Sequence, residues 1–153
     1  MDLSAYRIEE IYQFAAMIEQ GGFDFYVKLI EACDNTRVKN ELTYLRDEEA
    51  QHKAFFQGEL RRKGKGDATT LGPGLAAVME AEFVRPMDEF YKAGTITRIA
   101  EALRFGQTVE QKTIDFYGGL RGQSTDAAFL KDLDAIIEEE KKHKKTLSII
   151  LAY

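Results

Sequence analysis

The sequence of 153 residues contains a single cysteine, Cys33. One cysteine cannot form an internal disulfide, and it cannot supply a Cys-x-x-Cys site for iron or zinc. This scarcity excludes a scaffold held together by disulfides and favours a reducing compartment. We therefore expect the protein to be cytoplasmic.

Long apolar runs and an excess of basic residues are also missing. No stretch approaches the roughly 18 apolar residues of a membrane span, and Met1 to Ser4 do not begin a basic segment followed by an apolar run. The formal net charge is −5, and the basic residues stand among acidic ones. We expect neither a membrane nor a nucleic acid as a partner.

Strand signals are lacking, whereas helical periodicity is strong. Apolar or small residues recur at steps of three and four along four segments, whose stripes begin at Ile8, Val38, Ile99 and Phe129. Glycines and prolines interrupt the pattern in the middle of the chain. We predict an all-α four-helix bundle in a single domain, 1–153. It comprises a hairpin at about 4–64, a crossover with short helices at about 65–94, and a hairpin at about 95–152.

The two predicted hairpins repeat each other. A shift of 91 residues places Glu19 on Glu110, Glu49 on Glu140, and His52 on His143. These are the only histidines in the sequence, so an accidental match is a poor explanation. The same shift repeats several other positions, among them Gln20 and Gln111, Asp24 and Asp115, and Lys53 and Lys144. The halves therefore look like copies of one helical hairpin.

The repeated residues have the chemistry of a two-metal site. A glutamate and a histidine three residues apart share one helix face, so each Glu-x-x-His pair can hold a metal ion. A glutamate from each of the other two helices completes the carboxylate layout known from helical bundles. Two divalent cations would neutralise four buried carboxylates. If the glutamates of the Glu-x-x-His pairs bridge the metals, coordination positions stay open for oxygen or peroxide.

Alternative interpretations exist for several of these positions. The Glu-x-x-His pairs could be ordinary contacts on a solvated face, but the apolar stripes place all six residues inward. Glu48 and Glu139 also repeat, yet they lie beside the stripe. Tyr26 and Tyr117 could donate hydrogen bonds to ligating carboxylates or could be plain core residues. We expect Asp24 and Asp115 to form interhelical ion pairs.

The motifs resemble the ferritin-like di-iron carboxylate superfamily, and specifically its rubrerythrin-related branch, over essentially the whole chain. The matching motifs are Glu19-x6-Tyr26, Asp47 to His52, Glu110-x6-Tyr117, and Glu138 to His143. The resemblance implies a ferritin-like bundle with an oxo- or hydroxo-bridged iron pair. It implies terminal ligands Glu19 and Glu110, bridging ligands Glu49 and Glu140, and histidine ligands His52 and His143. It also implies frequent dimers, so we expect a homodimer.

The resemblance further implies reduction of hydrogen peroxide or oxygen by two iron ions per chain. Two departures bear on this prediction. Rubrerythrins proper carry an extra glutamate at the position of Thr113, so peroxidase chemistry is less strongly implied. A rubredoxin-like domain needs four cysteines for its iron, so electrons would come from a separate donor protein. We also predict that Thr113 and its counterpart Gly22 leave room for a small oxidant.

Two other functions remain open from the sequence. The first is ferroxidase activity with iron storage or handling. The second is a non-redox helical module with a structural metal pair, since carboxylate and imidazole ligands also accept manganese or zinc. We expect a di-iron oxidoreductase.

Overall fold

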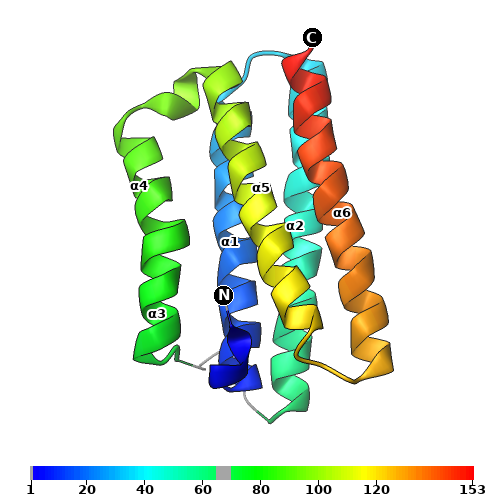
Figure 1. Ribbon diagram of the computed structural model, residues 1–153. Coiled ribbons are helices and arrows are strands. Elements are labelled where there is room, and N and C mark those ends of the chain that lie inside the picture. Colours follow the sequence, from blue (N-terminus) through cyan, green and yellow to red (C-terminus); the bar gives the residue numbers. More distant parts are fainter. Residues whose placement is uncertain (1, 65–69) are drawn as a thin grey trace. The chain divides into compact units, whose positions relative to one another are not determined.

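The computed structural model describes residues 2–64 and 70–153, which are mostly helical and contain no strand within these ranges (Figure 1). The long helices are α1 (Ile8–Ala32), α2 (Thr36–Arg62), α5 (Ile99–Arg121) and α6 (Ala127–Leu151). The shorter segments are η1 (Leu3–Ala5), α3 (Pro73–Met79), η2 (Glu80–Val84), α4 (Arg85–Lys92) and η3 (Thr95–Thr97). The predicted all-α, ferritin-like class is confirmed. The first five residues of the predicted crossover, 65–69, lie outside the described ranges.

The contacts divide the chain into two compact units. One unit, Tyr6–Ile99, holds the first hairpin together with the crossover. The other holds the second hairpin, Ala100–Tyr153, and the N-terminal turn η1. The assignment of both units to a single domain stays a prediction. None of the helices in the described ranges has the length and apolarity needed to cross a lipid bilayer.

Two helices begin where the sequence offers capping side chains. Asn35 accepts a hydrogen bond from the Val38 amide at 3.1 Å, at the start of α2. Asp126 accepts from the amides of Ala128 and Phe129 at 3.0 and 3.2 Å, at the start of α6. These side chains satisfy amides that have no partner inside the helix. The short loops before each cap let the second helix of each hairpin fold back on the first.

The predicted apolar stripes form the core of each unit. The stripe residues Tyr12, Leu42, Leu103 and Leu133 are all buried, whereas Ile8 and Ile99, the first residues of α1 and α5, are half-buried. In the first unit the crossover segments pack on α1. There Phe14 meets Phe83 edge to face at 5.8 Å between ring centroids, and Phe25 meets Phe90 at 5.7 Å. The crossover thus covers one side of the first hairpin (Figure 1).

The segments α3, η2 and α4 run end to end as one rod along α1 (Figure 1). Pro86 lies in the first turn of α4 and has no amide hydrogen, so it cannot donate to the carbonyl one turn back. The helix is widened to a π turn over Glu80–Val84, and the Arg85 amide donates to the carbonyl of Glu80. The backbone keeps right-handed helical angles through Val84 and Arg85. The π turn therefore lets the helix continue past a proline.

The start of α3 is held by Glu10 of α1. The buried Glu10 carboxylate accepts a hydrogen bond from the Gly72 amide, and Gly72 is the residue that caps α3. This bond, followed by weaker contacts with Arg7, lowers the pKa of Glu10. The Glu10 carboxylate thus connects the start of α3 to α1.

Replacement of Glu10 by glutamine should lower the free energy of unfolding by about 1 kcal/mol, because the backbone amide of Gly72 loses a charged hydrogen-bond acceptor. The folded pKa is depressed, so the wild-type contribution is present above the ordinary glutamate value of 4.5 and is lost as the pH falls through the folded value. Urea unfolding at pH 7 and at pH 3 measures both effects. The neighbouring variant Glu9→Gln, in the same helical turn, should change stability much less.

Candidate metal centre

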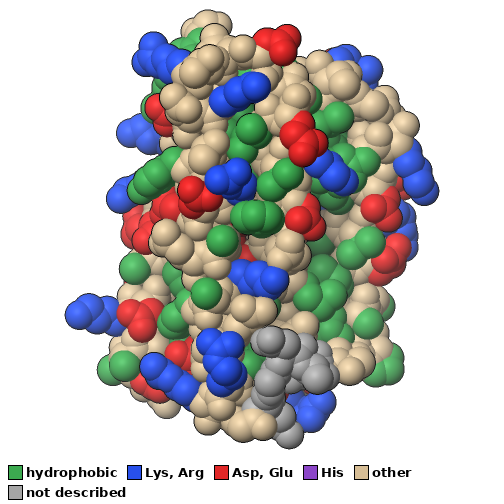
Figure 2. Space-filling model, turned by 180° about the vertical axis from the view of Figure 1, so that it is seen from behind, with side chains coloured by type: hydrophobic (Ala, Val, Ile, Leu, Met, Phe, Trp, Pro, Cys, Tyr) green, Lys and Arg blue, Asp and Glu red, His purple; other side chains and the backbone are tan. Residues whose placement is uncertain are grey.

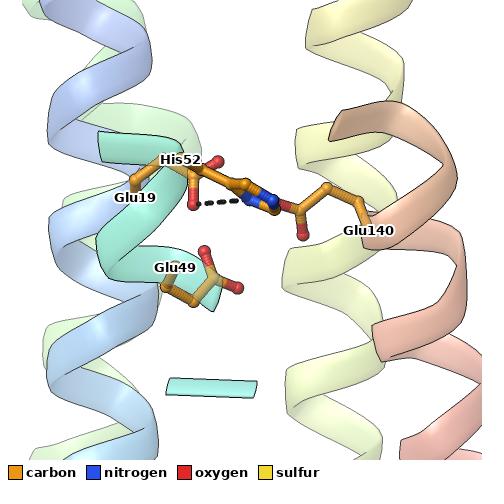
Figure 3. Close-up of side chains that lie close together, drawn as sticks. All are labelled: Glu19, Glu49, His52 and Glu140. Atoms are coloured by element: carbon orange, nitrogen blue, oxygen red, sulfur yellow. Dashed lines mark ion pairs between the residues drawn. The ribbon is translucent and has the colours of Figure 1, made fainter. Parts of the chain in front are cut away.

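The first hairpin buries a triad of two glutamates and a histidine. Glu19 comes from α1, and Glu49 and His52 come from successive turns of α2. Their side chains point toward one another (Figure 3), and the potential ligand atoms lie within 4.8 Å of each other. His52 Nδ1 is 3.5 Å from Glu19 Oε2. No residue of the triad is more than 3% exposed. We call Glu19, Glu49 and His52 the first triad.

The second hairpin repeats this arrangement with Glu110 from α5 and Glu140 and His143 from α6. His143 Nδ1 lies 3.5 Å from Glu110 Oε1 and 3.3 Å from Glu140 Oε2. The potential ligand atoms again lie within 4.8 Å of one another, and all three residues are buried. We call these residues the second triad. Each helical hairpin therefore brings together its own three sequence-predicted site residues.

Burial and crowding strongly shift the ionisation of the second triad. Desolvation, followed by the charge of Glu140, raises the pKa of Glu110 to about 8. Burial alone would lower the pKa of His143, but its contacts with Glu110 and Glu140 outweigh burial and raise it to about 10. Without a cation, the triad therefore retains protons near neutral pH. A divalent cation would supply the positive charge that otherwise comes from these protons.

The composition of the triads fits a divalent metal. Each offers carboxylate oxygens and one imidazole nitrogen, which together suit iron, manganese or zinc. Four carboxylates in the two triads would balance two divalent cations. The burial of all six groups would be costly for unpaired charges, and two divalent cations would compensate that cost. These ligand types do not discriminate among iron, manganese and zinc.

The space beside Gly22 is taken by a carboxyl group of the first triad. A β carbon placed on Gly22 would lie 3.1 Å from Glu49 Cδ and 3.1 Å from Glu49 Oε2. The room that we predicted there for a small oxidant is therefore filled by Glu49. At the counterpart position, Thr113 is buried, and its hydroxyl donates to the Val109 carbonyl of its own helix at 3.0 Å. A role for Thr113 in oxidant access stays a prediction.

The Gly22→Ala variant should separate folding stability from metal binding. Alanine in a helix interior gains up to about 1 kcal/mol over glycine, but here its β carbon would displace the Glu49 carboxyl group. We expect little net change in stability and roughly tenfold weaker metal binding. Gly21→Ala is the matched control, because nothing lies within 4 Å of its β carbon. Metal titration should distinguish the two alanines, and equal affinities would contradict the contact with Glu49.

The remaining candidate residues are divided by their burial. Glu48 is 9% exposed, whereas its counterpart Glu139 is half-buried, so this repeated pair does not share one environment. Glu49 and Glu140 are both buried, which favours them as the ligating pair. Tyr26 and Tyr117 are fully buried. Hydrogen bonds from their hydroxyl groups to the carboxylates of the triads stay a prediction.

Within the described ranges, Asp24 and Asp115 do not form the interhelical ion pairs that we expected. Each accepts a hydrogen bond from a glutamine of its own helix, Gln20 for Asp24 and Gln111 for Asp115. The reason is geometric, because residues four apart on a helix are neighbours.

The face of the molecule shown in Figure 2 carries interspersed acidic and basic side chains, and no histidine is visible on it.

Comparison with known proteins agrees with the geometry of the triads. The family described as Rubrerythrin matches residues 10–151, which include both triads and the crossover between the hairpins. No curated protein and no solved structure matches the chain. The family match covers well over half of the sequence. The chain therefore belongs to the rubrerythrin family.

Proposed function

We propose that this protein is a di-iron carboxylate oxidoreductase that reduces hydrogen peroxide or oxygen. The observation that carries this proposal is the presence of two buried triads of identical composition, each assembled by one helical hairpin. Membership of the rubrerythrin family supports iron over other metals. Burial of the triads supports reactivity confined to small oxidants.

In this proposal the six residues of the two triads, four glutamates and two histidines, would hold two metal ions. Glu19, Glu49 and His52 would hold metal in the first hairpin, and Glu110, Glu140 and His143 would hold metal in the second. An iron pair, when bound, would supply the two electrons needed to reduce peroxide.

The protein's own contribution is to hold and shelter these groups. The carboxylates would be fixed by their helices before the metal arrives, and buried apolar stripes would exclude bulk water. The Tyr26 and Tyr117 hydroxyls would orient ligating carboxylates. When metal binds, Glu110 and His143 would lose the protons that they hold in its absence.

The proposed reaction needs partners. Electrons would come from a separate donor protein, since the single cysteine of this sequence cannot build a rubredoxin-type iron site. We propose a cytoplasmic homodimer. Analytical ultracentrifugation of the purified protein would test the dimer, and a sedimentation coefficient of a monomer would contradict it.

The function is tested by loading metal-free protein with Fe(II) under anaerobic conditions and adding peroxide or oxygen separately. Near-ultraviolet absorbance reports the oxidised iron pair. Rapid oxidation by peroxide supports a peroxide reductase, and rapid oxidation by oxygen supports an oxygen reductase. Iron that binds but reacts with neither would contradict the redox function and leave a structural metal pair.

Ferroxidase activity is the second candidate function, and the residue at position 113 supports it. Position 113 is a threonine, so it offers no carboxylate where rubrerythrins proper have an extra glutamate, and its hydroxyl donates to the Val109 carbonyl of its own helix. In a ferroxidase, iron itself is the substrate and leaves the centre after oxidation. Repeated turnover of excess Fe(II) by oxygen, with iron released or stored, would favour this candidate over peroxide reduction.

A further inference from the structure

In each hairpin a lysine joins the two helices immediately beside the triad. In the first hairpin Lys53 Nζ donates to Gln20 Oε1 at 2.6 Å, and Gln20 Nε2 donates to Asp24 Oδ1 at 2.8 Å. Lys53 belongs to α2, whereas Gln20 and Asp24 belong to α1. The lysine and the glutamine are half-buried. The hydrogen bond from Lys53 to Gln20 therefore links α2 to α1 at the edge of the core.

The second hairpin contains the same chain of contacts. Lys144 Nζ donates to Gln111 Oε1 at 2.8 Å, and Gln111 Nε2 donates to Asp115 Oδ1 at 2.9 Å. An ammonium group can only donate and a carboxylate can only accept, so the orientation of the glutamine amide is fixed from both sides. The duplication has thus preserved donors, acceptors and distances together. We call the contacts Lys53–Gln20 and Lys144–Gln111 the lysine–glutamine bridges.

The position of each bridge connects it to its triad. Gln20 directly follows Glu19, and Lys53 directly follows His52. The bridge therefore joins the same two helical turns that present these triad residues. The Glu19–His52 contact itself is 3.5 Å long, which is too long for a strong hydrogen bond. The shorter, charge-assisted bridge is the firmer constraint on the rotation of the two helices.

We propose that Gln20, Lys53, Gln111 and Lys144 are positioning residues for metal binding. None of them is a ligand. By fixing the rotation and register of the helices, each bridge keeps a glutamate of one helix opposite the histidine of the other. The bridge leaves the ligand atoms available to the metal because it uses the neighbouring residues. This role rests on the proposed function, since it requires that the triads bind metal.

The direction of the change in metal affinity distinguishes a positioning role from a simple electrostatic effect of the lysine charge. The lysine is a positive charge next to a cation site, so its removal alone should strengthen metal binding. Loss of positioning should weaken it. Lys144→Met removes both the charge and the bridge, whereas Gln111→Leu removes the bridge and keeps the charge. If positioning dominates, both variants bind metal more weakly.

The second hairpin also offers a matched control. Arg121 Nε lies 2.7 Å from Asp134 Oδ1, so this ion pair also joins α5 to α6, but it does so at the loop end of the hairpin. Both of its side chains are about half exposed. Arg121→Met therefore breaks an interhelical contact that lies away from the second triad. It reports the effect of helix pairing alone.

The experiment is a Co(II) titration of metal-free wild type, Lys144→Met, Gln111→Leu, Lys144→Arg and Arg121→Met. The visible bands of Co(II) report ligand geometry, and urea unfolding reports stability. We expect roughly tenfold weaker binding of one of the two ions in Lys144→Met and in Gln111→Leu, with shifted Co(II) bands. Lys144→Arg should retain affinity near wild type. Arg121→Met should change neither affinity nor spectrum.

The results also distinguish failure of the inference from failure of the proposed function. Wild-type protein that does not bind two Co(II) ions per chain would overturn both. Wild-type binding with unchanged or tighter binding in Lys144→Met and Gln111→Leu would overturn only the positioning role. The double variant Lys144→Met/Gln111→Leu should be no weaker than the worse single variant, because both substitutions break one contact. Should Lys144→Met fail to fold, Gln111→Leu decides the outcome.

Discussion

Replacement of Glu110 by glutamine should weaken metal binding by more than about 100-fold and should stabilise the metal-free protein at alkaline pH. Burial and the neighbouring Glu140 raise the pKa of Glu110 from 4.5 to about 8. The folded protein therefore prefers the neutral acid, which glutamine resembles in shape and charge. Removal of a proposed metal ligand should therefore weaken metal binding, whereas relief of a buried charge should raise the stability of the metal-free protein.

The pH dependence follows from the sign of this shift. Because the folded pKa is raised, the stabilising contribution of Glu110 is fully present below about pH 4.5 and is lost as the pH rises through about 8. Metal-free wild type and Glu110→Gln should differ little at pH 5, and the variant should be the more stable at pH 9. Urea unfolding at both values measures the difference.

The exposed pair Lys141–Glu138 provides the control for this substitution. Glu138 is 65% exposed and forms its ion pair within one helix at 3.0 Å. Glu138→Gln should alter stability by no more than about 0.5 kcal/mol and leave metal affinity unchanged. Tight metal binding by Glu110→Gln would contradict the assignment of Glu110 as a ligand.

Addition of metal to the metal-free protein should raise the free energy of unfolding by about 2.7 kcal/mol for each ion when the metal is at 100 times its Kd. The proposed ligands are brought together only in the folded chain, so metal should bind the native state in preference to the unfolded one. Urea unfolding with Co(II) and with a chelator measures this difference. It should be much reduced in Glu110→Gln.

Metal binding should also release protons and become tighter between pH 6 and pH 8. Glu110 and His143, with pKa values of about 8 and 10, hold protons at neutral pH that the ligated forms must lose. Calorimetric titration in buffers of different ionisation enthalpy counts the released protons. A Co(II) affinity that does not depend on pH would show that these groups are not ligands.

The helices and the two Glu-x-x-His pairs could be predicted from the sequence because each depends on short-range spacing. Glu49 and His52 stand three residues apart, so any α-helix places them on one face. The 91-residue shift then identifies Glu140 and His143 as the same pair in a second copy. The apolar stripes predicted which faces are buried, and the burial of both histidines agrees with them.

Other features depend on contacts that spacing does not encode. The bond from the Gly72 amide to Glu10 joins residues far apart in the chain, and the sequence gives no signal for it. The filling of the space at Gly22 by Glu49 required side-chain positions on two helices. The repetition of Gln20 and Lys53 was visible in the sequence, but only the structure shows that they touch.

The most direct measurement is an iron count by native mass spectrometry after anaerobic titration of metal-free protein with Fe(II). The two triads predict that wild type binds two iron ions per chain, and that Glu110→Gln binds fewer at the same Fe(II) concentration. Binding of two ions by both proteins would show that the metals lie elsewhere. A wild-type chain that binds no iron would contradict a metal centre built from Glu19, Glu49, His52, Glu110, Glu140 and His143.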